Sequence, residues 1–226
     1  MTTNRYNVFN NIHKGLRGML YDTGAMIQRT DFSQQTAVVT VNRVNWVMDI
    51  FDEHARHEDL YLLPLAFRNN EALAREFEKE HEVDHRLSDD LRSALKSWLQ
   101  SDNEGERAAT GQAIFFAFNE FTAFNLYHMN KEENVLLLNL WNHYTDQDLL
   151  AAEASIVQSI EPSTLLEESK WMMRSISNPE IIGWLTGIRH HAPPPVFEMY
   201  LSLAGQELPA DRFTEIARAL EVLALA

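Results

Sequence analysis

The sequence predicts an all-α protein, an up-down-up-down four-helix bundle with extra C-terminal helices. Apolar residues recur three and four positions apart, without the alternation that is typical of strands. Only 8 glycines and 7 prolines occur, and most prolines lie late, so the first two-thirds has few helix breakers. Short segments separate four such stretches, and short loops make neighbouring helices antiparallel. We place the bundle over residues 1–145 and a helical extension, packed on the bundle or at an interface, over residues 146–226.

The first two helices are predicted from an apolar face and from a capping segment. The first helix should span about residues 6–29, and its apolar face is formed by Phe9, Ile12, Leu16 and Leu20. Residues 30–33 (TDFS) supply side chains of the kind that cap a helix N-terminus. The second helix should then run to about Phe67, with Pro64 near its end.

The third and fourth helices are bounded by polar breaks. Asn69 and Asn70 interrupt the chain, and a third helix is expected over about residues 71–99. The run SDNEGE around Gly105 predicts a loop. The apolar and aromatic stretch from Ile114 to about Trp141 predicts the fourth helix.

Beyond residue 145 the pattern predicts shorter helices. One should follow Asp146, and a second should be capped by the segment from Thr164 to Glu167, which has the spacing of a capping box. Asn178-Pro179 should open the next helix. The run Pro193-Pro194-Pro195 should break the chain before a further helix, and Pro209 should open the last one.

Composition excludes several classes of function. The formal charge of −14 disfavours nucleic acid and anionic membrane surfaces as partners, because both would repel an acidic protein. The absence of cysteine excludes disulfides, thiolate nucleophiles and cysteine-ligated metal clusters. The N-terminus lacks the pattern of a signal peptide, and no apolar run is long enough for a membrane span. We therefore expect a cytoplasmic protein.

Metal-competent side chains fall on all four predicted bundle helices. The set comprises His13, His54, Glu58, His81, His85 and His128, with Glu132 and Glu133 following the last histidine. Residues four apart share one face of a helix, so His54 can act with Glu58, and His81 with His85. The same faces are otherwise apolar, where an imidazole or carboxylate is unfavourable unless it finds a partner. A metal ion in the bundle interior would satisfy these groups together.

The donor types favour iron or another borderline first-row metal over calcium or magnesium, which prefer oxygen ligands. Carboxylates can also bridge two adjacent ions and offset their charge.

Two other kinds of metal site fit the sequence less well. HEVDH, residues 81–85, has the spacing of a zinc protease helix, but Asp84 lies inside it and Glu80 and Arg86 flank it. No strand is predicted nearby to bind an extended peptide. Ferritin-like carboxylate sites need Glu-x-x-His on two helices, whereas here that spacing occurs only on the third.

The motifs resemble those of the hemerythrin-like, or HHE cation-binding, family. The matching segments are His13, HARHE (54–58), HEVDH (81–85) and HMNKEE (128–133), and the resemblance covers about the first 145 residues. It implies two non-haem iron ions. One ion would be held by His81, His85 and His128, and the other by His13 and His54. Glu58 and Glu133 would bridge the two ions.

One position departs from the dioxygen carriers of the family. They carry an aspartate five residues after the last histidine, where this sequence has Glu133. Glu132, four residues after His128, could take the place of Glu133. Because oxygen, iron and nitric oxide sensors share the scaffold, this departure disfavours simple transport.

The predicted function is binding or sensing of a small diatomic ligand, dioxygen or nitric oxide, or of iron or redox state. The alternative is a di-iron enzyme that scavenges peroxide or nitric oxide. A zinc protease and a metal-free helical interaction protein are weaker hypotheses. A homodimer through the C-terminal helices is a further prediction.

The other histidines have simpler interpretations. His57 is expected beside a ligand or at the surface, and Tyr61 could hydrogen-bond a ligand. His143, His190 and His191 are expected at the surface. Core packing or a dimer contact is expected for Trp171, Met172, Met173, Trp184, Phe197 and Met199.

Overall fold

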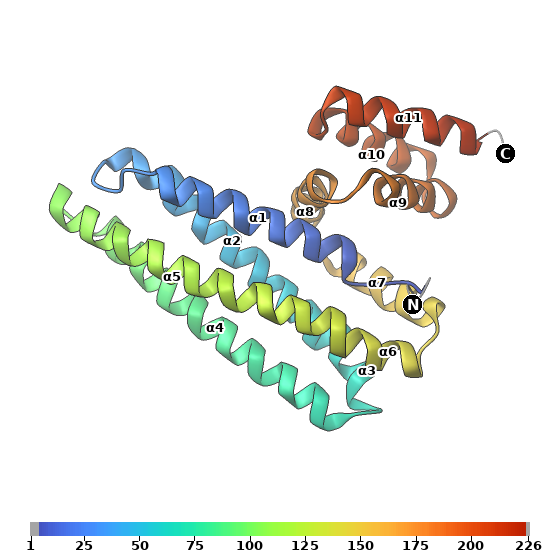
Figure 1. The fold of residues 1–226 in the computed structure, drawn as a ribbon, viewed down its shortest axis with the longest axis horizontal. Coiled ribbons are helices and arrows are strands. Elements are labelled where there is room, and N and C mark those ends of the chain that lie inside the picture. Colours follow the sequence, from blue (N-terminus) through green and yellow to red (C-terminus); the bar gives the residue numbers. More distant parts are fainter. Residues whose placement is uncertain (1–4, 225–226) are drawn as a thin grey trace. The chain divides into compact units, whose positions relative to one another are not determined.

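The computed structural model describes residues 5–224, and every regular element in that part of the chain is a helix (Figure 1). Contacts divide the chain into two compact units. The first contains Met19–Ser159 and the residues before Asn10, and the second combines Asn10–Gly18 with the chain from Ile160 onward. Helix α1 (Asn10–Arg29) therefore contributes to both units. The predicted domain boundary after residue 145 stays a prediction.

The first unit is built on long antiparallel helices. Helices α2 (Val38–His57), α4 (Glu71–Leu99) and α5 (Glu104–Lys131) follow one another, with α2 packed on α4 and α4 packed on α5 (Figure 1). The later half of α1 completes the bundle, because a Cβ at Gly24 would lie 3.6 Å from the Phe118 ring of α5 and Arg43 of α2 donates a hydrogen bond to Thr23. The predicted four-helix bundle with additional C-terminal helices is confirmed.

Two of the bundle helices continue through a π-helical turn. Helix α2 passes through Glu58–Leu62 into α3 (Leu63–Phe67). Helix α5 passes through Glu132–Leu136 into α6 (Leu137–His143). The first residue of each turn is a buried glutamate, and single π-helical turns are frequently found at functional sites.

Side-chain hydrogen bonds explain where helices α4 and α5 begin. Helix α4 has its predicted ends, because Asn70 accepts a hydrogen bond from the backbone N–H of Leu73 at 3.1 Å and caps the N-terminus. Helix α5 begins ten residues earlier than Ile114, because the Asn103 side chain caps it by accepting from the N–H of Glu106 at 3.0 Å. The predicted loop is confined to residues 100–103.

The first two helices start later than predicted. Helix α1 begins at Asn10, after a turn in which the Asn7 side chain accepts a hydrogen bond from the N–H of Phe9. The predicted capping of α2 by residues 30–33 is wrong. The Asp31 carboxylate instead accepts from the N–H of Ser33 at 3.0 Å, and a 3-10 turn, Gln35–Ala37, leads into α2.

The remaining helices are short, as predicted. Helix α7 (Asp146–Ser159) belongs to the first unit. The second unit contains α8 (Pro162–Ser175), α9 (Asn178–His191), α10 (Pro194–Glu207) and α11 (Ala210–Ala224). The predicted capping box at Thr164 is wrong, because Pro162 opens α8 two residues earlier. The capping box is instead formed by Ser177 and Glu180, before α9.

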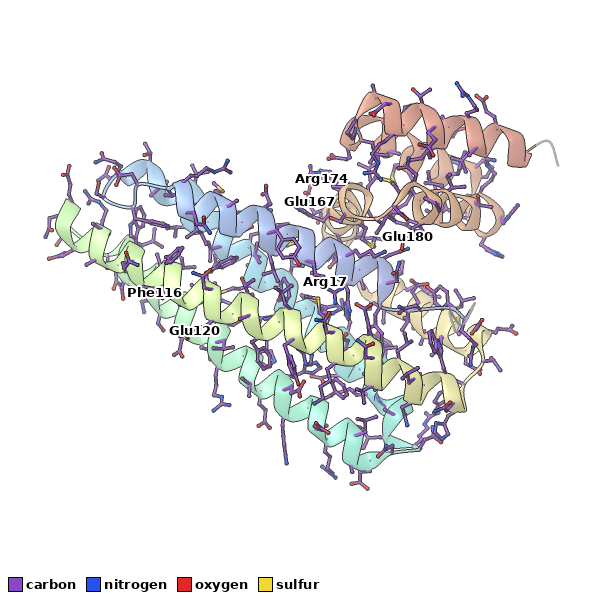
Figure 2. All side chains as sticks on the ribbon, in the orientation of Figure 1. Arg17, Phe116, Glu120, Glu167, Arg174 and Glu180 are labelled. Atoms are coloured by element: carbon purple, nitrogen blue, oxygen red, sulfur yellow. The ribbon has the colours of Figure 1, made fainter. Side chains whose placement is uncertain are left out.

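The second unit has an apolar core of its own. Its fully buried residues include Met173, Ile181, Leu185, Ala204 and Ile216. Trp171 is also buried, and Trp184 and Phe197 pack against this core, as expected, whereas Met199 is 48% exposed. Arg174 of α8, which is labelled in Figure 2, donates a hydrogen bond to Glu207 of α10 at 2.6 Å.

The start of α1 packs closely within the second unit. Asn10 donates a hydrogen bond to Glu180 at 2.9 Å, and Lys14 forms an ion pair with the same carboxylate. Gly15 and Gly18 allow the backbone of α1 to approach α8. A Cβ at Gly18 would lie 2.2 Å from Ser175 Oγ, so a side chain there would force a neighbour to move.

Across residues 5–224, none of the helices has the length and apolar character needed to cross a membrane.

Candidate metal centre

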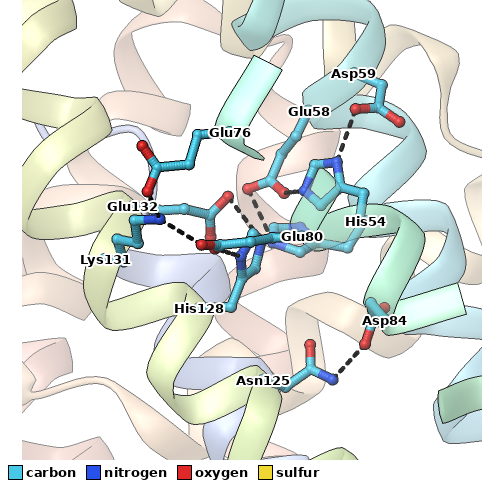
Figure 3. Close-up of polar contacts among 11 residues, drawn as sticks. His54, Glu58, Asp59, Glu76, Glu80, Asp84, Asn125, His128, Lys131 and Glu132 are labelled. Carbon is cyan, nitrogen blue, oxygen red and sulfur yellow. Dashed lines mark hydrogen bonds and ion pairs between the residues drawn. The ribbon is translucent and has the colours of Figure 1, made fainter. Parts of the chain in front are cut away.

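Four buried donors converge inside the bundle (Figure 3). One ligand atom from each lies within 4.8 Å of the others, and the four residues are Glu58, His81, His128 and Glu132. Their exposed fractions are 2%, 3%, 5% and 0%, respectively. Isolated charges at such burial are strongly unfavourable, so the group requires mutual compensation or an ion.

Each histidine Nε2 faces a carboxylate. His81 Nε2 lies 3.4 Å from Glu58 Oε2, and His128 Nε2 lies 3.3 Å from Glu132 Oε1. The two imidazole rings are 5.0 Å apart between centroids. The inward nitrogens and carboxylates are thus placed where a shared cation could replace their mutual contacts.

The opposite nitrogens are held by further carboxylates. His128 Nδ1 lies 2.8 Å from Glu80 Oε2 (Figure 3). His81 Nδ1 lies 2.7 Å from Asp59 Oδ1. Lys131 in turn pairs with Glu80. A carboxylate on one ring nitrogen fixes the orientation of a histidine and makes its other nitrogen a better metal ligand.

The surroundings of His81 and His128 raise the pKa of both imidazoles. Burial lowers the pKa of His81, but the contacts with Asp59 and Glu58 outweigh it and raise the pKa to about 10. Burial likewise lowers the pKa of His128, while Glu132 and Glu80 raise it to about 11. At neutral pH these shifts favour the cationic form of both imidazoles, beside the buried side chains of Glu58 and Glu132.

A second group of donors overlaps the first. Ligand atoms of His54, Glu58 and Glu132 also lie within 4.8 Å of one another, and His54 Nε2 is 3.2 Å from Glu58 Oε1. Both groups therefore use the same two glutamates. His13 is fully buried on α1, in the Asn10–Gly18 stretch that belongs to the second unit. Its place relative to the other donors stays a prediction.

The structure differs from the predicted ligand set at His85 and Glu133. The His85 side chain is 51% exposed, and its Nδ1 lies 3.6 Å from Asp52 Oδ1. Glu133 is half-buried, and neither residue belongs to a metal-competent group in residues 5–221. Glu132 occupies the interior instead, one α-helical turn after His128.

The spacing of the α4 core explains why His85 turns outward. The buried stripe of this helix alternates steps of four and three through Phe77, His81, Asp84, Ser88 and Leu91. His85 is the residue after a core position, on the edge of that stripe. The seven-residue repeat of this stripe includes His81 but not His85. Comparing that repeat with the His-x-x-x-His motif could have predicted that only His81 points inward.

Several residues of the site were missed by sequence reasoning. Asp84 is 3% exposed and accepts a hydrogen bond from Asn125 Nδ2 at 2.6 Å. Burial raises the pKa of Asp84, opposed by this hydrogen bond and by the charge of His128. The spacing of the α4 core indicates that Asp84 is buried. Nothing in the sequence indicates that Asp59 and Glu80 contact histidines of other helices.

Other histidines lie outside the donor groups. His57 is buried, with its Nε2 3.1 Å from Arg56 Nη2, and burial lowers its pKa. Its ring centroid is 6.4 Å from that of Tyr61. His143, His190 and His191 are exposed.

Comparison with known families agrees with the geometry. The model of the hemerythrin HHE cation binding domain matches residues 4–138, which is more than half of the chain and includes all the donors above. Searches of curated proteins and of solved structures found no match. The convergence of buried histidines and glutamates inside a four-helix bundle is what a cation-binding domain requires. The chain belongs to the hemerythrin HHE cation-binding family.

Proposed function

We propose that this is a non-haem di-iron protein that binds or senses a small diatomic ligand, dioxygen or nitric oxide, or responds to iron or redox state. The observation that carries the proposal is the buried group of Glu58, His81, His128 and Glu132. Two imidazoles with two carboxylates suit iron better than calcium or magnesium.

The overlap of the two donor groups supports two ions. Glu58 and Glu132 are common to both groups, so we assign them as bridging ligands. His81 and His128 would complete one site, and His54 with His13 would complete the other. We leave His85 and Glu133 outside the proposed set because the structure does not bring them to the cluster. When bound, two carboxylate-bridged iron ions would supply reversible one-electron chemistry to a small ligand.

The remaining residues orient the ligands and exclude water. Asp59 and Glu80 fix the histidine rings through their Nδ1 atoms. Phe124 stacks on His128 with ring centroids 5.8 Å apart, and Phe77 meets the same ring edge-on at 5.8 Å. These aromatic rings shield the centre from solvent and lower the local dielectric, which strengthens electrostatic contacts.

Metal analysis of the purified full chain tests the proposal. After loading with ferrous iron without oxygen, we expect about two iron ions per chain, set by the two overlapping groups of nitrogen and oxygen donors. On oxidation the optical spectrum should be that of a carboxylate-bridged ferric centre.

Two histidine variants provide a matched comparison. His81→Ala should lose iron and lower the thermal stability of the loaded protein. His143→Ala removes an exposed histidine, so it should retain both properties. Equal iron contents in the two variants would contradict the assignment.

A peroxide or nitric oxide scavenger is the second candidate. The observation in its favour is the buried hydrogen bond between Asp84 and Asn125, which lies one helical turn from His81 and His128. An apolar lining at that place would instead favour retention of bound dioxygen, as a carrier requires. Turnover separates the candidates, because a carrier or sensor gives reversible ligand spectra without steady consumption of the ligand.

A further inference from the structure

Polar residues follow a line along the contact between α4 and α5, starting at the metal centre. The two helices are antiparallel, so residues later in α4 lie beside residues earlier in α5. The rings of His81 and His128 are neighbours and Asp84 is hydrogen-bonded to Asn125, and by the same register we place Ser88 opposite the turn of α5 that carries Thr122. We name this set the polar ladder and its three pairs the rungs. The remainder of the α4 stripe beyond it is apolar, beginning with Leu91.

The second rung is a fixed hydrogen-bonded pair. Asn125 Nδ2 donates to Asp84 Oδ1 at 2.6 Å and to the backbone oxygen of Phe121 at 3.1 Å. Asp84 and Asn125 are each 3% exposed. Neither belongs to the metal-competent groups of the described residues. A buried carboxyl and amide are unfavourable compared with apolar packing, which suggests that this rung serves a purpose other than stability.

The third rung carries two hydroxyls that lack partners. Ser88 Oγ and Thr122 Oγ1 are buried and have no hydrogen-bond partner among residues 5–221, and Ser88 is only 1% exposed. Several other helical hydroxyls bond to the carbonyl four residues earlier, although Thr186 of α9 does not. Ser93 and Ser97 on α4 and Thr110 on α5 all do so at 2.9 Å. The helices therefore allow this bond, and Ser88 and Thr122 do not form it.

We propose that the polar ladder binds a small protic oxygen molecule, water or hydrogen peroxide, between α4 and α5 beside the metal centre. A buried water usually makes about three hydrogen bonds to groups that would otherwise lack partners. The ladder offers the Asp84 carboxyl and the Ser88 and Thr122 hydroxyls on adjoining turns. Its role in selecting protic ligands over apolar gases rests on the proposed function, because the first rung consists of two proposed metal ligands.

The double variant Ser88→Ala/Thr122→Val tests the ladder in the full chain. It removes both hydroxyls with little change in shape. The matched control is Ser93→Ala/Thr110→Val, whose hydroxyls already have carbonyl partners. Thr122→Ser in the Ser88 wild-type background keeps both hydroxyls and should behave as the wild type.

The first measurement needs no metal. A crystal structure of the metal-free chain, at a resolution that shows ordered water, should contain a water bonded to Ser88 Oγ or Thr122 Oγ1. The double variant should lack that water and keep its thermal midpoint. A dry third rung in the wild type would overturn the proposal whether or not the protein binds iron.

The second measurement uses the iron-loaded protein and two probes. Loss of a ladder hydrogen bond should lower the rate of reaction with hydrogen peroxide about tenfold while leaving nitric oxide binding unchanged. An ordered water with unchanged peroxide rates supports the ladder with water as its occupant. A wild type that binds no iron would refute the proposed function, and the crystal structure alone would then decide the ladder.

Discussion

Glu80 Oε2 lies 2.8 Å from His128 Nδ1, so a carboxylate outside the donor group sets the direction of a histidine inside it. Lys131 joins this contact to Glu76, which is 57% exposed on its side chain. A continuous series of polar contacts therefore links the buried imidazole to the surface of α4.

Replacement of Glu80 should weaken metal binding. Glu80→Gln removes the carboxylate that orients His128, and we expect metal affinity to fall by about 10- to 100-fold. Glu76→Gln is the matched control, because Glu76 contacts Lys131 and not the histidine. Competition with a chromophoric chelator measures both affinities. Equal losses in the two variants would assign the effect to the surface charge.

Metal binding should release protons and strengthen as pH rises. A metal ligand must be a neutral imidazole, and the pKa values of His81 and His128 are raised to about 10 and about 11 in the metal-free chain. Binding at pH 7 should thus displace about two protons per chain. Calorimetric titration in buffers of different ionisation enthalpy counts them. Binding enthalpies that are independent of the buffer would refute this expectation.

The same shifts give the metal-free protein an alkaline limit. The folded pKa values of His81 and His128 lie above the unfolded value of 6.5. Their contribution to stability is therefore complete below about pH 6.5 and disappears as pH rises through 10 and 11. Urea unfolding of metal-free wild type and His81→Gln between pH 6 and pH 10.5 should converge at the alkaline end. Parallel curves would contradict the assignment.

Glu180 should stabilise the second unit at neutral pH. Burial raises its pKa, but contacts with Lys14, Ser177 and Asn10 outweigh burial and lower the pKa to about 2. Because the folded pKa lies below the unfolded value, this stability is present above pH 4.5 and lost as pH falls through 2. Glu180→Gln should lower the urea midpoint at pH 7 and reduce its loss in acid. Glu198→Gln, at an exposed position of α10, should leave both unchanged.

Gly111 and Gly183 should respond oppositely to alanine. A Cβ at Gly111 would lie 2.1 Å from Phe32 Cβ, whereas one at Gly183 would meet nothing within 4 Å. Gly111→Ala should destabilise the protein by about 1–3 kcal/mol through overpacking. Gly183→Ala should stabilise it by about 0.5–1 kcal/mol, because alanine favours the helix. Thermal midpoints measured by circular dichroism compare the two, and a shift in the same direction would contradict the packing argument.

The sequence predicted the helices wherever apolar spacing and capping agreed. The bounds of α4 follow from Asn70 and a regular stripe. The π-helical turns that begin at Glu58 and Glu132 leave no comparable mark, because an insertion into a helix is set by packing against its neighbours.

Part of the buried cluster could be predicted from the sequence for the same reason, whereas which of its residues bind metal stays a prediction. His54, Glu58, His81 and His128 stand on apolar stripes, which a sequence reveals. The choice of Glu132 over Glu133 depends on the angular position of adjacent residues at the end of α5, and one residue moves a side chain by about 100°. The contact of Asp59 with His81 depends on the register of two helices, which a sequence does not state.

The participation of α1 in both units limits how the protein can be divided. A chain shortened to end at residue 159 would retain α1 but lose Met172, Ser175 and Glu180. Lys14 would lose its counter-charge, and the glycine face of α1 would meet water. The helices after residue 159 would likewise lose the segment that completes their unit when expressed alone. Isolated halves should therefore aggregate or fray, and engineering of this protein is best done on the undivided chain.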